Sequence, residues 1–112
     1  MSELIEKKCQ VCEYGDFKPF NTEEVKPYLE QVDSNWRLGD EGKKISREFQ
    51  FKGFYKTMAF VNAVAWVANS EGHHPDMEVS FNKCVVNFTT HAVDGLTEND
   101  FICAAKVDAL LK

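Results

Sequence analysis

The sequence lacks the features of a membrane protein or of a nucleic-acid binder. No segment approaches the run of about 20 apolar residues that spans a bilayer. The opening stretch MSELIEKKCQVCEYG mixes charges of both signs and has no apolar core of a secretory signal. Acidic residues outnumber basic ones by 18 to 13, whereas electrostatic binding of nucleic acid needs a basic surface. We therefore expect a cytoplasmic protein with no membrane or direct nucleic-acid partner, whose four cysteines stay reduced.

Several motifs that carry chemistry are also missing. The sequence has no glycine-rich phosphate loop, no nucleophile elbow and no stripe of basic and aromatic residues. Cys9 and Cys12, in CQVC, form only half of a zinc site, because Cys84 and Cys103 stand alone in later segments. We therefore assign no role to this pair and expect neither a metal nor a cofactor.

What is present suffices for one globular domain. The chain has 112 residues, of which 44% are hydrophobic and 28% are charged, and these values are ordinary for a folded protein. Nine phenylalanines and two tryptophans supply aromatic mass for a core. We expect a single domain over residues 1–112, in which residues 1–20 are the least patterned segment.

The first half of the chain predicts a helix and a hairpin. A helix is expected over Thr22–Val32, with Thr22 as its N-cap. The segments NWRL and KKISREFQF flank GDEG, which favours a turn, so they are expected to pair as an antiparallel hairpin. In the second segment, every other residue is expected on the half-buried face of a strand, and polar residues lie between them. The residues of the half-buried face are Ile45, Arg47, Phe49 and Phe51.

The segment FYKTMAFVNAVAWVANS changes to the period of a helix. One apolar stripe contains Phe54, Met58, Val61, Ala65 and Ala68, and a second contains Phe60, Val64 and Val67. Lys56 is the only charged residue between Phe54 and Ser70. A helix with so little polar surface needs cover on more than one side, so we expect the sheet on one side and another subunit on the other.

A second hairpin and a closing helix complete the expected fold. MEVSF and CVVNFTTH flank Asn82 and Lys83, which are expected to form a two-residue turn. His91 then emerges on the polar face at the strand end. The closing helix, in LTENDFICAAKVDALLK, has Thr97 as its expected cap. This order predicts an α+β fold, with a four-stranded antiparallel sheet and helices packed on one face.

The three histidines are the main candidates for chemistry. His73 and His74 lie in EGHHPDM, where the following proline favours extended backbone, so the two side chains are expected to point in opposite directions. Imidazole suits proton transfer near neutral pH because its free pKa is about 6.5. The residues alone leave three readings open: exposed loop histidines, acid/base catalysts, or metal ligands. The metal site would join His73 or His74 to His91 and to Glu71 or Asp76.

The motif HHPDM, followed by TTH and then by GLTENDF, resembles the pterin-4a-carbinolamine dehydratase family. The likeness runs through REFQFKGFYKTMAFVNAVAWVA into DFICAAKVDAL, over about residues 33–111. It implies a four-stranded antiparallel sheet with helices on one side, assembled as a homodimer or homotetramer partly through the central helix. The chain departs from the family pattern at Gly53 and Gly72, where other members have aspartate, and at Met77, where animal members have tryptophan.

The resemblance implies a cofactor-free hydro-lyase, 4a-hydroxytetrahydrobiopterin dehydratase. Such an enzyme eliminates water from the pterin 4a-carbinolamine to give quinonoid dihydropterin, which recycles tetrahydrobiopterin for aromatic amino-acid hydroxylases. The resemblance assigns catalysis to His73, His74 and His91, with His73 and His91 in the acid/base steps and His74 mainly binding and orienting the pterin. Asp100 would orient His91 or support its charge. Further residues implied to line the pterin pocket are Pro75, Thr90, Ala92 and Val93.

Two other functions stay open from the sequence. Animal members of the resembled family also act as dimerisation partners of a homeodomain transcription factor, so the chain could be a non-catalytic pterin-binding or dimerisation module that acts through its helical interface. A pterin enzyme acting on a molybdopterin-like substrate is the third reading. The enzyme is favoured, because a pure interaction module needs neither the three histidines nor Asp100.

Overall fold

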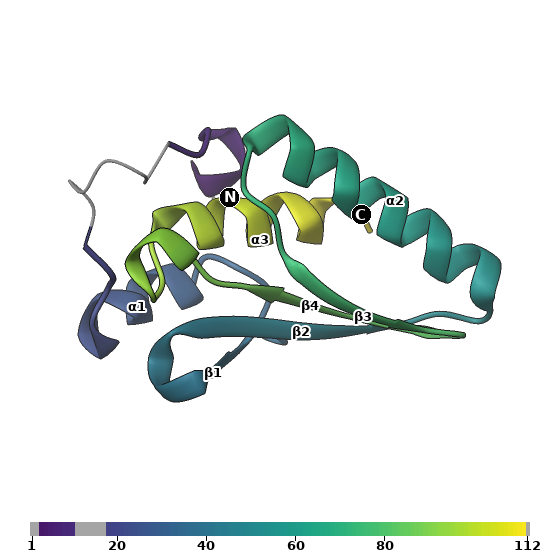
Figure 1. The fold of residues 1–112 in the computed structure, drawn as a ribbon, viewed down its shortest axis with the longest axis horizontal. Helices are drawn as coiled ribbons and strands as arrows, with labels where there is room; N and C mark the ends of the chain where they lie inside the picture. Colours follow the sequence, from purple (N-terminus) through teal and green to yellow (C-terminus); the bar gives the residue numbers. More distant parts are fainter. Residues whose placement is uncertain (1–2, 11–17, 112) are drawn as a thin grey trace.

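The computed structural model describes residues 3–10 and 18–111 of the chain (Figure 1). In chain order, the elements are η1 (Glu3–Glu6), α1 (Thr22–Leu29), β1 (Arg37–Gly39), η2 (Asp40–Gly42), β2 (Lys44–Gln50), α2 (Phe54–Glu71), β3 (Asp76–Ser80), β4 (Lys83–Phe88), η3 (His91–Val93) and α3 (Glu98–Ala109). No helix among these residues is long and apolar enough to cross a membrane.

The four strands form one antiparallel sheet in the order β1-β2-β4-β3. Helices α2 and α3 lie side by side over the same face of this sheet, as Figure 1 shows. The predicted α+β fold, with a four-stranded antiparallel sheet and helices packed on one face, is therefore confirmed. Both predicted hairpins are present.

The core lies between the sheet and the helices. Alternation along β2 and β4 directs one set of side chains toward the helices, where Ile45, Phe49, Val86 and Phe88 are each at most 3% exposed. Helix α3 is the most buried helix of the described chain, with nine of its residues buried. Its N-terminal turn carries Asp100, which is 0% exposed, so α3 brings a carboxylate into the interior.

Helix α2 buries a narrower face than its composition suggests. Its buried residues are Thr57, Phe60, Val64 and Ala68. The expected stripe that begins at Phe54 is therefore only partly inside, and Phe54 itself is 53% exposed. Because the helix is apolar around most of its circumference, its period could not determine which side faces the sheet.

Two local boundaries differ from the predictions. Helix α1 is capped by Asn21, whose side chain accepts the N–H of Glu24 at 2.9 Å while Glu24 accepts the N–H of Asn21 at 2.9 Å. This reciprocal pair moves the cap one residue before Thr22, and the helix ends at Leu29. In the second hairpin Ser80 pairs with Lys83, so the turn is formed by residues 81–82 and not by Asn82 with the following lysine.

Candidate active site

The end of α2 determines how His73 enters the interior. Gly72 has φ of +67°, a left-handed conformation that glycine adopts without steric cost. The N–H of His73 then bonds to the carbonyl oxygen of Ala68 at 3.2 Å. The side chain of His73 is 12% exposed, whereas His74 is exposed. This difference in burial is what the prediction that the two side chains point in opposite directions implies.

Asp100 is the buried partner of His73. Nε2 of His73 lies 2.7 Å from Oδ1 of Asp100, which is 0% exposed. The other carboxylate oxygen, Oδ2, accepts the hydroxyl of Thr90 at 2.7 Å and the backbone N–H of Thr97 at 3.0 Å. A carboxylate only accepts hydrogen bonds, so this arrangement holds the proton of His73 on Nε2 and presents Nδ1 as the second ring nitrogen. The ring of Phe88 lies nearly parallel to the imidazole, at 9° and 6.0 Å between centroids.

His91 stands apart from this buried pair. Its side chain is 75% exposed, and its Nε2 is 3.8 Å from Oδ2 of Asp76, which is 74% exposed. A contact of that length between two exposed groups contributes little to stability. The expectation that Asp100 orients His91 is therefore wrong, since Asp100 is bonded to His73 instead.

Thr90 connects the buried pair to the segment that carries His91. Thr90 is 3% exposed, and because its one proton goes to Asp100, its oxygen accepts the hydroxyl of Thr97 at 2.8 Å. Backbone bonds between Thr90 and Gly95 close the intervening loop, at 2.8 and 3.4 Å. Thr90 thus supports Asp100 from inside. Of the other expected lining residues, Ala92 is exposed, and Pro75 and Val93 are half-buried.

Gly95 is required where this loop meets the N-terminal segment. A Cβ atom at Gly95 would lie 2.6 Å from Cβ of Pro19, closer than atoms of this kind approach one another. The adjoining N–H of Phe20 bonds to the carbonyl of Leu96 at 2.7 Å. The loop after β4 therefore packs against Pro19 through Gly95 and bonds to Asp100 through Thr90.

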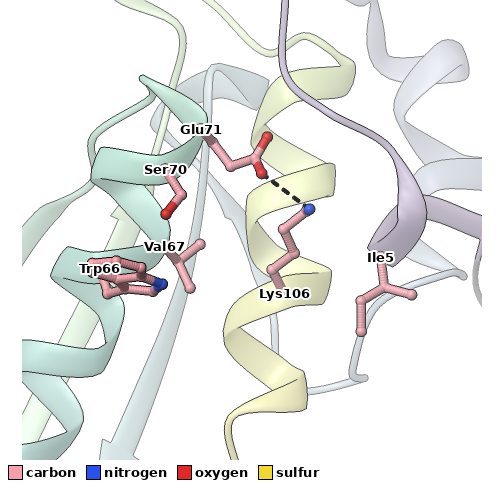
Figure 2. Close-up of a pocket in the computed structure, with 6 residues that line it drawn as sticks. All are labelled: Ile5, Trp66, Val67, Ser70, Glu71 and Lys106. Atoms are coloured by element: carbon pink, nitrogen blue, oxygen red, sulfur yellow. Dashed lines mark ion pairs between the residues drawn. The ribbon is translucent and has the colours of Figure 1, made fainter.

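Glu71 was predicted as a possible metal ligand, but both of its carboxylate oxygens bind other groups of the protein. Its Oε2 pairs with Nζ of Lys106 at 3.0 Å, as Figure 2 shows, and its Oε1 accepts the backbone N–H of Cys9 at 2.8 Å. Burial alone would raise the pKa of Glu71, but the Cys9 amide and the Lys106 ammonium outweigh it and lower that pKa. Within residues 3–10 and 18–111, no group of three His, Cys, Asp or Glu side chains is arranged to hold a metal ion. Cys12, the second cysteine of CQVC, lies outside the described residues.

Comparison with known proteins places the chain in one family. The family model described as "Pterin 4 alpha carbinolamine dehydratase" matches residues 18–110. The chain belongs to this family. Its members include a relative from Nitrosomonas eutropha that is 56% identical over 97% of this chain and 94% of its own length. A relative from Legionella pneumophila strain Corby is 54% identical over 98% of this chain and 96% of its own length. Both are named, provisionally, as pterin-4-alpha-carbinolamine dehydratases.

Two solved structures share the fold of this family member. One, described as a transcriptional coactivator/pterin dehydratase from Brucella melitensis, has a TM-score of 0.79 and 29% identity, covering 85% of this chain and 100% of its own. The other is a pterin dehydratase-like protein described as a RuBisCO assembly factor in the alpha-carboxysome. It has a TM-score of 0.59 and 25% identity over 68% of this chain and 88% of its own. Proteins of this fold thus carry descriptions both as enzymes and as assembly or regulatory factors.

Two residues of the buried site were missed in the sequence. Thr97 was expected only as a helix cap, yet its N–H and hydroxyl both belong to the bonds around Asp100. Phe88 was predicted only as part of the strand in CVVNFTTH, yet its ring lies nearly parallel to the ring of His73. A local signal for Thr97 was present, because Thr97 stands three residues before Asp100, the spacing of a capping box. No local pattern marks the contact of Phe88 with His73, which joins two separate segments of the chain.

Proposed function

We propose that this protein catalyses the dehydration of a pterin 4a-carbinolamine, with 4a-hydroxytetrahydrobiopterin as substrate and quinonoid dihydropterin as product. The observation that carries the proposal is the buried hydrogen bond between His73 and Asp100 in a chain of the dehydratase family. A carboxylate that is 0% exposed and bonded to an imidazole is costly to bury for stability alone. Its geometry is that of an aspartate that orients a catalytic histidine.

The reaction needs two proton transfers and no change in oxidation state. An acid delivers a proton to the hydroxyl on C4a, the C4a–O bond breaks, and water leaves. A base removes the proton from N5, and its electron pair forms the double bond between N5 and C4a. One proton is gained and one is lost, so two imidazoles suffice to move both.

His73 is well placed for the step that makes its ring cationic. When Nδ1 accepts a proton from N5, the imidazolium that results is stabilised by the adjacent Asp100 carboxylate. His91 would then serve as the acid, since its exposed ring can exchange protons with solvent between turnovers. His74, which is exposed beside His73, would bind and orient the pterin, with Pro75, Ala92 and Val93 lining the same site. Thr90 would act through Asp100.

The test is the dehydration rate of synthetic 4a-hydroxytetrahydropterin, followed by absorbance. We expect His73→Ala and His91→Ala each to lower kcat by about 10²-fold or more, because each removes a proton-transfer group. His74→Ala should mainly raise KM. Circular dichroism of each variant checks that the fold is kept. Wild-type protein that fails to exceed the uncatalysed rate would contradict the proposal.

The physiological setting follows from the same reaction. A cytoplasmic dehydratase of this kind would return quinonoid dihydropterin for reduction and so support an aromatic amino-acid hydroxylase that uses tetrahydrobiopterin. A cell that lacks this protein but contains the hydroxylase should accumulate the carbinolamine or its rearrangement products. Chromatography of pterins from such cells, with and without the gene restored, would test the link.

Assembly as a homodimer or homotetramer is supported by the exposed side of α2. Phe54, Tyr55 and Trp66 are 53%, 87% and 74% exposed, and large apolar side chains that gather on a surface are typical of an interaction site. An adjoining groove of about 410 Å³ is lined partly by Leu110 and Leu111. We expect sedimentation at micromolar concentration to show an oligomer, and Trp66→Glu to shift it toward the monomer. Wild-type protein that sediments as a monomer would contradict this.

A second function is supported by the descriptions of the two solved relatives. A coactivator and an assembly factor both work by binding other proteins, and the exposed side of α2 offers this chain a surface for such contacts. A non-catalytic module predicts pterin affinity without turnover, together with capture of a partner that depends on α2. Turnover that is lost when His73 is replaced would show that the protein is an enzyme and not a non-catalytic module.

A further inference from the structure

Two cysteines that are far apart in the chain meet beside the end of α2. Sγ of Cys9 lies 3.5 Å from Sγ of Cys103, although 94 residues separate them. Cys9 follows η1, and Cys103 lies in the second turn of α3. The sulfur atoms of a disulfide are about 2.05 Å apart, so these two sulfurs need to approach by about 1.5 Å to bond.

Hydrogen bonds from the backbone of the N-terminal segment keep Cys9 close to Cys103. The N–H of Cys9 bonds to Glu71 at 2.8 Å. The next residue, Gln10, exchanges two bonds with the side chain of Asn99: its N–H donates to Oδ1 at 3.0 Å, and its carbonyl accepts from Nδ2 at 2.7 Å. The segment that carries Cys9 is thereby attached to both α2 and α3, with Cys103 one turn beyond Asn99.

The two thiols differ in their access to solvent. Cys9 is half-buried, whereas Cys103 is 0% exposed. The contact with the Cys9 sulfur, together with burial, raises the pKa of Cys103 far above that of a free thiol, so Cys103 remains protonated. A soluble oxidant therefore reaches Cys9 first. Cys84 is buried within β4, where burial raises the pKa of its thiol.

We propose that Cys9 and Cys103 are a redox-active dithiol. A hydroperoxide oxidises the two thiols to a reversible intramolecular disulfide. The sulfur of Cys9 attacks the O–O bond of hydrogen peroxide, which gives a sulfenic acid and releases one water. The sulfur of Cys103 then attacks the Cys9 sulfur, the S–O bond breaks, and the departing hydroxide leaves as a second water with the Cys103 proton. Two thiols lose two electrons, and one peroxide gains them. A small dithiol reductant reverses the step by thiol–disulfide exchange.

Oxidation would fasten the N-terminal segment covalently to the helix that carries Asp100. The two residues that bind the N-terminal segment lie next to the pair of His73 and Asp100. Glu71 is two residues before His73, and Asn99 directly precedes Asp100. The loop closed by the new bond spans most of the chain, so the oxidised protein should be the more stable form. This proposal does not depend on the dehydratase activity.

The test uses a variant with only two cysteines, Cys12→Ser/Cys84→Ala. The reduced protein is treated with equimolar hydrogen peroxide, unreacted thiols are alkylated, and the intact mass is measured. We expect the mass of the monomer to fall by two hydrogen atoms, with no alkylation, and the midpoint of thermal unfolding to rise by at least about 5 °C. A dithiol reductant should reverse both changes, and adding Cys9→Ser should abolish them.

A second measurement does not depend on replacing the buried Cys84. In Cys12→Ser protein, cleavage after Glu98 separates the peptide containing Cys84 from the peptide containing Cys103. Mass spectrometry without reduction should then find Cys9 linked to Cys103. Two alkylated thiols in the two-cysteine variant, a persistent sulfenic or sulfinic acid at Cys9, or a disulfide only between molecules would each overturn the proposal.

Discussion

Replacement of Asp100 by asparagine isolates the chemical role of its charge, because the side chain keeps its shape. Asp100 accepts hydrogen bonds from His73, Thr90 and the N–H of Thr97. An asparagine oxygen can still accept the last two, but its NH₂ group then faces Nε2 of His73. The imidazole must carry its proton on Nδ1 to accept that bond, which removes the base from the substrate side. The charge that stabilises the imidazolium is lost in the same change.

The expected loss in rate follows from these two effects. A hydrogen bond to a charged group is worth about 1.5–3 kcal/mol, and each 1.4 kcal/mol in the barrier is about tenfold in rate. Together with the inverted tautomer, this predicts a fall in kcat of about 10²-fold to 10⁴-fold, with KM nearly unchanged. We expect the free energy of unfolding to fall by about 1–3 kcal/mol, measured by urea denaturation.

Asp108→Asn provides the matched control within the same helix. Asp108 is 8% exposed and bonds to Arg47 at 2.6 Å and to Nε1 of Trp36 at 2.8 Å. Its replacement should destabilise the protein by a similar amount while kcat of the folded protein stays unchanged. The reasoning is refuted if Asp100→Asn retains kcat within about threefold of wild type, or if both variants lose activity in parallel with stability.

Three further outcomes test the support around the site. Thr90→Val removes the donor to Asp100 at nearly constant volume, and we expect kcat to fall about 3-fold to 10-fold while KM is kept; an unchanged kcat in steady-state assays would show that the bond does not position the carboxylate. Gly95→Ala places a Cβ against Pro19 and should cost about 1–3 kcal/mol in urea denaturation, whereas a neutral result would mean that the loop yields. Glu71→Gln tests the lowered pKa of a carboxylate whose unperturbed pKa is 4.5. Its stabilising contribution is fully present above that value and is lost as pH falls through the lower pKa of the folded state, so the difference in unfolding temperature between wild type and variant should shrink from pH 7 to pH 3; a difference independent of pH would contradict the assignment.

The local features of the fold were accessible from the sequence because they depend on neighbours in the chain. Alternation around Ile45 and Phe49 predicted β2, and Thr97 was correctly placed at the start of α3. The cap of α1 was missed by one residue, although the signal was present: Asn21 stands three residues before Glu24, the spacing of a reciprocal cap. The turn of the second hairpin was also misplaced by one residue, since register depends on which strand faces pair in the sheet.

Only the tertiary structure decided which groups meet. By itself the sequence determined an α+β domain, three histidines and an aspartate in the spacing of a dehydratase, and an unusually apolar central helix. It assigned Asp100 to His91, nine residues away, but Asp100 bonds to His73, 27 residues away. That choice depends on where α2 ends, how α3 packs against the sheet and which way each side chain then points. The meeting of Cys9 with Cys103 has the same origin, because contacts across so many residues are set by packing and leave no periodic trace in the chain.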